Sequence, residues 1–243
     1  MIKFFRRIRF NLMSENKTGK YFKYAIGEII LVVIGILMAL QINNWNEDRK
    51  NKEILNSYKK SLITDLEQDT LALNSVIRYI KNDLIEIEKI GTRLSSKYAT
   101  KDTLIKIVRN ELSFASKAYR PPNNKTFLAM QTNGKLELFD KNTYTFLLEL
   151  HDKQSISESV IRANINQFLT QANHFFLKYS IDAYSVIEGD IVEKAWQNVD
   201  ADDLYRSVQG CLTLKKIMNE NTGKNYMDVL EATEKVISHL KTN

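Results

Sequence analysis

The sequence predicts an all-α protein, in which a single N-terminal transmembrane helix continues into an extracytoplasmic helical bundle with two long helices. Two observations support this fold class. The chain of 243 residues contains only 8 Gly and 2 Pro, which are too few for the turns of a many-stranded sheet. Along most of the chain, apolar residues recur at intervals of three or four, which is the period of a helix with one buried face.

The most informative stretch runs from Tyr24 to Ile42 and reads YAIGEIILVVIGILMALQI, with Glu28 and Gln41 as its only strongly polar side chains. A helix of this length spans about 29 Å, close to the hydrocarbon thickness of a bilayer. We therefore expect residues 24–42 to cross a membrane. A cleaved signal peptide is the alternative, but the Leu-Gln-Ile-Asn-Asn-Trp that follows Ala39 lacks the small residues of a cleavage site.

The distribution of charge predicts the orientation of this span. Residues 1–23 hold seven Lys or Arg and one acidic residue, Glu15. The positive-inside rule places such a tail in the cytoplasm and residues 43–243 on the other side of the membrane. From residue 44 onward, 28 basic and 27 acidic residues nearly cancel, so the bundle lacks a basic stripe and nucleic acid is not an expected partner.

The basic tail also has an amphipathic pattern. Its apolar residues recur at helical spacing with basic residues between them, which predicts a short helix lying on the lipid of an anionic inner leaflet. An unstructured tail that serves only to orient the span is the alternative. The apolar set is Ile2, Phe5, Ile8 and Leu12, and the interfacial basic set is Lys3, Arg6, Arg7 and Arg9.

Four residues of the span and its end are candidates for contact with the membrane or a partner. Glu28 can extend its carboxylate toward the interface, or it can bind a polar group on another membrane helix. Gly35 and Ala39 form a small-xxx-small pair that favours close helix packing. Trp45 lies where an aromatic side chain anchors a span at the interface.

The first 53 residues closely resemble the N-terminal signature of a family of uncharacterised single-pass proteins from flavobacteria and related Bacteroidota. They read MIKFFRRIRFNLMSENKTGKYFKYAIGEIILVVIGILMALQINNWNEDRKNKE. Residues 126–139, TFLAMQTNGKLELF, are similar to a looser version of that family's helix, glycine and Leu-rich segment. The resemblance implies an inner-membrane anchor with a periplasmic domain, and it supplies no catalytic residue.

Beyond Trp45, the apolar positions predict one long amphipathic helix through Leu94, because no Pro and no Gly before Gly91 interrupts it. The polar residues Asp69 and Thr70 break a coiled-coil register. We therefore expect this helix to pack against later helices of the same chain, with a dimeric coiled-coil stalk as the alternative.

The remaining helices are predicted from the same period and from residues that begin or end helices. Asp140 and Asp200 are suitable N-caps, Gly134 is a suitable stop, and Pro121 with Pro122 requires a loop. The two long helices of the bundle are then the one after Trp45 and the one after Asp140. The other expected helices cover 102–116, 126–133, 202–219 and 222–240, and the second long one covers 141–184.

No constellation of residues predicts catalysis, so we expect no catalytic residue, no cofactor and no metal ligand. The histidines, His151, His174 and His239, lack metal-ligand spacing, and a single cysteine cannot complete a zinc site. Cys211 lies on an apolar helix face and is expected to be a buried, inert thiol, with an intermolecular disulfide as the alternative.

Carboxylate pairs and aromatic residues also have structural explanations. Pairs such as Asp65 with Asp69, and Asp202 with Asp203, are expected at solvated helix surfaces and caps. A set of aromatic residues could line a ligand cavity, but we expect it to fill the core. This set is Phe168, Phe175, Phe176, Tyr179 and Tyr184.

These patterns favour a non-catalytic, membrane-anchored module that binds or scaffolds another protein of the cell envelope, or a second copy of itself. The alternative is a small-molecule sensing subunit. Such a subunit would have to signal through a membrane partner, because residues 1–23 contain no signalling module of their own.

Overall fold

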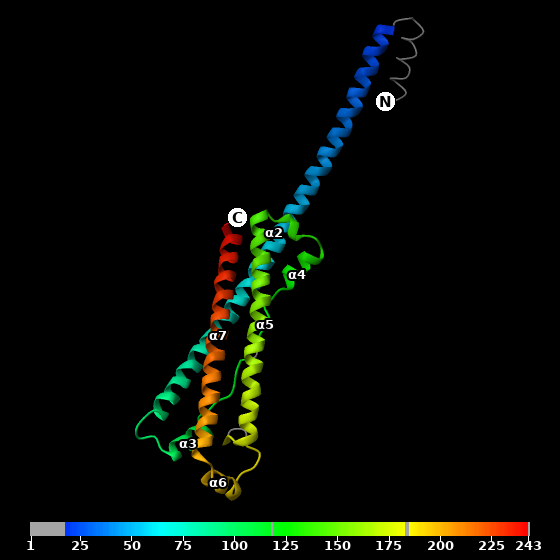
Figure 1. The fold of residues 1–243 in the computed structure, drawn as a ribbon. Helices are drawn as coiled ribbons and strands as arrows, with labels where there is room; N and C mark the ends of the chain where they lie inside the picture. The colour runs from blue at the N-terminus through cyan, green and yellow to red at the C-terminus, as the bar shows by residue number, and fades with distance from the viewer. Residues whose placement is uncertain (1–17, 118, 183–184, 243) are drawn as a thin grey trace. The chain divides into compact units, whose positions relative to one another are not determined.

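A computed structural model describes residues 18–117, 119–182 and 185–242. These residues form six α-helices and one 3-10 helix, with no strand among them, which confirms the all-α prediction (Figure 1). The chain divides into two compact units, residues 1–57 and residues 58–243. The helices are α2 (Thr18–Leu94), α3 (Lys101–Asn110), α4 (Lys125–Thr132), η1 (Leu136–Leu138), α5 (Lys141–Lys178), α6 (Asp190–Gln197) and α7 (Ala201–Thr242).

The described part of the first unit consists of α2 alone. Within the candidate span Phe22–Leu94, an 18-residue window reaches a mean hydropathy of 2.5, and none of that window is buried. Large apolar side chains are exposed all around this stretch, for example Ile29, Val32 and Leu37. A helix that is apolar on every side requires apolar surroundings. The predicted long apolar helix near the N-terminus is thus confirmed, and it is compatible with a single-pass membrane protein.

The second unit is built on three long helical segments, where the sequence predicted two. They are α2 from Tyr58 onward, α5, and α7, and the last two run side by side in opposite directions (Figure 1). The expected break in α7 between Asn219 and Thr222 does not occur. Both residues are buried instead of forming an exposed turn, and Gly223 faces α2 so closely that an added Cβ would lie 3.3 Å from Ile80 Cγ2. Close packing on α2 therefore explains this glycine, and the helix runs through it.

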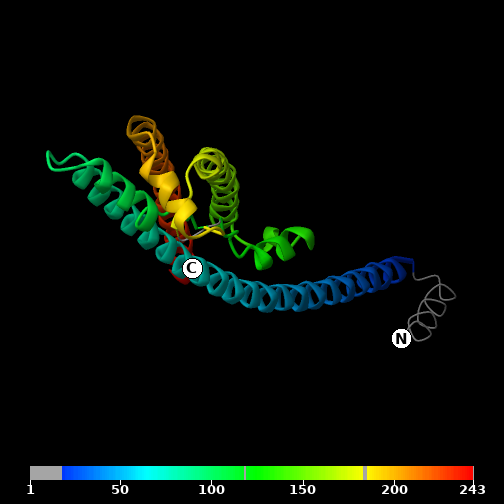
Figure 2. The same cartoon turned by 90° about the horizontal axis from the view of Figure 1, so that it is seen from below.

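Three groups of buried apolar residues join these segments. Leu62 and Leu66 of α2 pack with Val236 and Leu240 of α7 near one end of the bundle. The prediction that the long helix packs against later helices of its own chain is thus confirmed. The middle group is Ile77, Ile80, Ile161 and Tyr226, and the largest group includes Ile87, Ile90, Leu104, Ile107, Val108, Phe168, Phe175, Leu204 and Val208. Through the largest group, α3 folds back along the end of α2 (Figure 2).

The predicted caps are confirmed by local hydrogen bonds. Asp140 accepts from the backbone N–H groups of Asn142 (2.9 Å) and Thr143 (3.1 Å) at the start of α5. Asp200 accepts from the backbone N–H of Asp202 at 2.9 Å at the start of α7. Gly134 follows α4 with a φ of +63°, a conformation that favours glycine at a helix end.

Two predicted helix ends were wrong, because tertiary packing replaces the helical pattern there. After α3 ends at Asn110, Leu112 and Phe114 are both buried while Ser113 between them is exposed, an alternation that an extended segment produces and a helix does not. The helix α5 ends at Lys178 instead of residue 184. The next residue, Tyr179, is extended (φ −129°, ψ 126°).

Tyr179 holds this chain reversal in place. Its ring packs between Phe175 and Trp196, with centroid distances of 5.3 and 6.3 Å, and its hydroxyl donates to the carboxylate of Asp203. The short helix α6, which carries Trp196, was not predicted from the sequence.

Candidate functional site

The membrane and partner candidates lie on α2 within the first unit. Glu28 is half-buried, whereas Gly35, Ala39 and Trp45 are exposed. Residues 35 and 39 follow residue 28 by about two and about three helical turns, so all three share one face of the helix. A Cβ added at Gly35 would meet nothing within 4 Å, so this face is open. The predicted basic set Lys3, Arg6, Arg7 and Arg9 lies outside the described residues.

The histidines and the cysteine have structural contacts or lie at the surface. The ring of His151 stacks on Phe127 at 4.6 Å, His239 Nε2 lies 2.8 Å from Thr143 Oγ1, and His174 is exposed. Cys211 is buried, as predicted, and desolvation raises the pKa of its thiol to about 11, which keeps it protonated at neutral pH. In the described part of the chain, no three His, Cys, Asp or Glu residues are grouped to hold a metal ion.

The carboxylates of Asp65 and Asp69 were predicted to be solvated, and for Asp69 this was wrong. Only 7% of Asp69 is exposed, and its two oxygens accept from the backbone N–H of Asn123 at 2.9 and 3.0 Å. Asp65 accepts from the side-chain amide of Asn123 at 2.9 Å and from Thr126 Oγ1 at 2.6 Å. Burial raises the pKa of Asp69. The pair therefore fastens the Pro121-Pro122 loop and the start of α4 onto α2.

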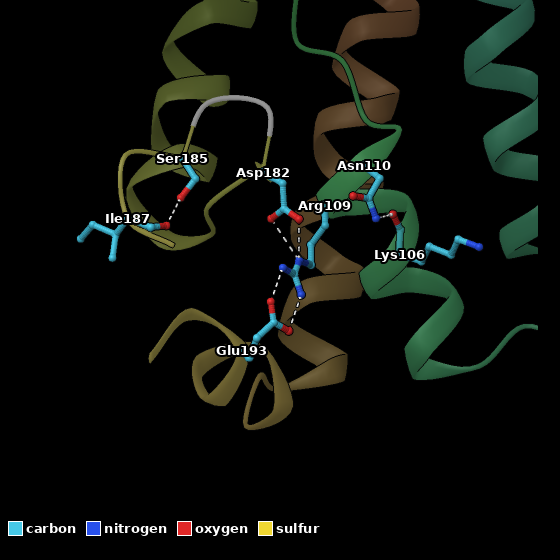
Figure 3. A network of polar contacts seen from close by, with 7 residues as sticks. All are labelled: Lys106, Arg109, Asn110, Asp182, Ser185, Ile187 and Glu193. Atoms are coloured by element: carbon cyan, nitrogen blue, oxygen red, sulfur yellow. Dashed lines mark hydrogen bonds and ion pairs between the residues drawn. The ribbon is translucent and has the colours of Figure 1, made fainter. Parts of the chain in front are cut away.

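A network centred on Arg109 of α3 fastens the other end of the bundle (Figure 3). Its Nε donates to both oxygens of Asp182, at 3.0 and 3.1 Å. Its Nη1 and Nη2 donate to Glu193 of α6, at 2.9 and 2.7 Å. The guanidinium also lies over the ring of Trp196, 5.7 Å from its centroid. Hydrogen bonds to Glu193 and then to Asp182 raise the pKa of Arg109, so it stays charged and ties both Asp182 and α6 to α3.

Beside this network lies an open apolar groove of about 720 Å³. Its walls are formed by the end of α5, residues 180–181 and 185–187, α6, and the segment after α3. Val186 is 97% exposed, and Ile187 and Ile191 are also exposed, although all three are apolar. The groove residues are Phe114, Ala115, Phe176, Ser180, Ile181, Ser185, Val186, Ile187, Ile191, Val192 and Ala195.

A separate cavity of about 250 Å³ lies in the middle of the bundle, between α2, α5, α7, Lys117 and residues 119–122. Aliphatic side chains such as Val76 and Ile161 form most of its wall, and Gln154 of α5 is a buried polar residue in it. None of the residues that line this cavity lines the groove.

The predicted aromatic set mostly fills the core. Phe168, Phe175 and Tyr179 are buried in the largest apolar group, and Phe176 packs against it while lining the groove. Tyr184 lies outside the described residues. The prediction of core filling is confirmed for Phe168, Phe175 and Tyr179, whereas Phe176 is only partly buried. The groove and the cavity were not predicted, because each draws on residues far apart in the sequence.

These features define the class of the protein: an all-α chain with a helical bundle and one helix long and apolar enough to cross a membrane. The model of the Family of unknown function (DUF6090) matches residues 28–145 of the chain. The resemblance to a family of unknown function is thus confirmed. The matched segment includes the second unit's part of α2 and the Pro121-Pro122 loop, and it ends shortly after α5 begins. No curated protein and no solved structure matches the chain.

Proposed function

We propose that this protein is a non-catalytic module, anchored in the bacterial inner membrane by residues 24–42, whose bundle binds another protein of the cell envelope from the periplasmic side. The observation that carries the proposal is the apolar groove with its exposed Val186. Exposed apolar residues gathered in one hollow are typical of surfaces that bind a protein. The Arg109 network supports this role because it holds the groove in shape before a partner arrives.

The chemistry of the groove suggests the kind of partner segment. Its walls are almost entirely apolar, and the acidic residues Glu188 and Asp190 adjoin its wall residues along the chain. An amphipathic helix with an apolar face and flanking basic residues would complement both features. A second copy of this chain is the other partner that the proposal allows.

A photo-reactive amino acid in place of Val186 tests the proposed partner surface in intact cells. We expect a cross-linked product that is reduced at least severalfold by Ile191→Asp, because a buried carboxylate opposes apolar docking. Ile156→Asp is the matched control, since Ile156 is an exposed isoleucine of α5 outside the groove. A product that survives Ile191→Asp, or is lost equally with Ile156→Asp, would contradict binding at the groove.

The proposed orientation is supported by the seven basic residues before the span and is tested by cysteine labelling. In a Cys211→Ser background, Ser14→Cys and Lys224→Cys report on the two sides of the span. We expect a membrane-impermeant maleimide to label intact spheroplasts at position 224 and not at position 14. The reverse pattern would show that the bundle is cytoplasmic.

Absence of catalysis is part of the proposal. The buried thiol of Cys211 is protonated, and the Asp65 and Asp69 carboxylates are occupied by hydrogen bonds to the loop at Asn123. These groups therefore have structural uses that leave little nucleophilic or acid-base capacity.

A small-molecule sensing subunit is a second candidate function, favoured by the cavity between α2, α5 and α7. A sensor would have to pass its signal to a membrane partner. If the chain is a sensor, we expect a small molecule in the cavity to change the yield of the cross-linked product from the photo-reactive residue at position 186. An unchanged yield with an occupied cavity would remove this candidate.

A further inference from the structure

The cavity in the middle of the bundle contains a polar group without a partner. Gln154 is only 4% exposed, and its Nε2 has no hydrogen-bond acceptor among the described residues. A buried amide donor without an acceptor is unfavourable, and because Gln154 lines the cavity, an acceptor atom that reaches its amide from there would relieve it. Ser157, which is also buried, lines the same side one turn along α5.

The rest of the lining indicates a mainly apolar ligand. Leu73 and Val76 of α2 face the cavity together with Ile161 of α5 and Val229 of α7. Pro121 closes the fourth side, and the Asp69–Asn123 hydrogen bonds hold that loop in place. The cavity is thus a built site, with walls from three helices and a fastened loop.

The charges around the cavity exclude a strongly charged ligand. The buried carboxyl group of Asp69 opposes an anion, and its oxygens already accept from Asn123. The exposed side chains of Lys117 and Arg120 lie at the side where the lining reaches solvent, and they oppose a cation. An uncharged molecule avoids both penalties.

The volume sets the size of such a molecule. An apolar cavity of about 150 Å³ holds benzene, so a cavity of about 250 Å³ has room for about ten non-hydrogen atoms. We propose that this cavity binds an uncharged, mainly apolar molecule of about that size, whose carbonyl or similar oxygen accepts the hydrogen bond of Gln154 Nε2. The biological role of this ligand rests on the proposed sensing function. Binding itself does not, because a ligand can occupy the cavity without any signal crossing the membrane.

Four probes of the same size and shape test the proposal on the full chain in lipid nanodiscs. Acetophenone has the required oxygen, α-methylstyrene replaces that oxygen by carbon, benzoate is the anion and benzamidine is the cation. Ligand-observed NMR measures their binding, with empty nanodiscs as the background for partition into lipid. We expect acetophenone to bind about three- to tenfold more tightly than α-methylstyrene, which is the usual net effect of one buried hydrogen bond. Both charged probes should bind more weakly than acetophenone.

Variants on the cavity wall tie the binding to this site. We expect Ala72→Phe to abolish binding of all probes by filling the cavity, and Gln154→Leu to remove the preference for acetophenone. Gln167→Leu is the matched control on an exposed position of α5 and should leave both affinities unchanged. The side-chain amide resonance of Gln154 gives a second readout in the unaltered protein, and it should shift with acetophenone and not with benzamidine.

Several outcomes would overturn the proposal. They are equal binding of acetophenone and α-methylstyrene, binding that survives Ala72→Phe, an unmoved Gln154 resonance, or no binding of any probe. Failure of the sensing function is a different result, in which acetophenone binds as expected and the cross-link from position 186 does not change.

Discussion

Lys215 Nζ lies 2.7 Å from Asp83 Oδ1 in the interior of the bundle, although 132 positions separate the two residues in the sequence. The side chains are only 4% and 13% exposed. Lys215 also donates to the carbonyl of Ser113 at 2.7 Å, and Asn219 Nδ2 donates to the other oxygen of Asp83 at 2.6 Å. This polar cluster joins α2, α7 and the segment after α3 at one level along the bundle axis. It therefore fixes the position of α7 along α2.

Removing one member of this buried ion pair should be strongly destabilising. We expect Lys215→Met to lower the free energy of unfolding by about 3–5 kcal/mol, because Asp83 would keep a buried charge without its cation. Lys215→Met combined with Asp83→Leu should lose less, since neither charge remains. Urea unfolding followed by circular dichroism measures both. The control is Lys241→Met, which breaks the exposed Lys241–Glu67 pair and should change stability by at most about 1 kcal/mol.

The close approach of α7 to α2 at Gly223 should not tolerate a large side chain. We expect Gly223→Leu to destabilise the bundle by about 1–3 kcal/mol, since its Cβ alone would lie 3.3 Å from Ile80 Cγ2. Gly210 is an exposed glycine of the same helix with nothing within 4 Å of an added Cβ. Gly210→Ala should therefore stabilise by about 0.5–1 kcal/mol through helix propensity. If both variants changed the unfolding midpoint in the same direction, the close contact would not control the packing.

Burial of Asp69 should make stability depend on pH in a defined direction. Its folded-state pKa is raised above the ordinary value of 3.8, mainly by desolvation, so the folded protein holds the proton more tightly than the unfolded chain. The contribution of this group to stability is therefore fully present below pH 3.8 and is lost as the pH rises through the folded-state pKa. We expect the stability of the unaltered protein relative to Asp69→Asn to fall over that interval.

Unfolding of both proteins at a series of pH values measures this difference. Asp65→Asn is a suitable comparison, because it removes the neighbouring carboxylate of the same loop anchor. A difference between the unaltered protein and Asp69→Asn that rises with pH would mean that hydrogen bonds from Asn123 outweigh desolvation.

The Arg109 network should control the local stability of the groove. Arg109→Lys keeps the positive charge but lacks the planar guanidinium, which donates through Nε to Asp182 and through Nη1 and Nη2 to Glu193. We expect amide hydrogen exchange in residues 185–197 to become about tenfold faster, the effect of losing one charge-assisted hydrogen bond, with little change in global stability. Arg93→Lys, at the exposed pair with Glu111, should leave this segment unchanged. Uniform acceleration throughout the bundle would instead assign Arg109 a global role.

Local patterns in the sequence were sufficient for several elements. The apolar stretch of α2, the caps at Asp140 and Asp200, and the stop at Gly134 were all predicted correctly. Each depends on residues within one or two helical turns, so no knowledge of the rest of the chain is required. The same local rules were wrong between Asn219 and Thr222, where they predicted a break and α7 is continuous.

The polar contacts of Asp69 and Arg109, in contrast, could not be predicted from local patterns. Asp69 looks like a surface residue in its own helix, and only the loop at Asn123, 54 positions away, makes it a buried anchor. Arg109 has no special neighbours in the sequence, yet it binds residues 73 and 84 positions away. No spacing rule connects such residues, because their proximity results from the packing of whole helices.

The amino-acid order alone therefore established that the protein is helical, that one helix is apolar on every side, and where many helices begin. These properties follow from side-chain hydrophobicity and from backbone groups that need nearby partners. Packing of the folded chain decided which polar residues are buried, which glycine lets helices approach, and where the groove and the cavity form. Those outcomes depend on the volume and charge that distant segments present to one another, which becomes defined only when α2, α5 and α7 come together.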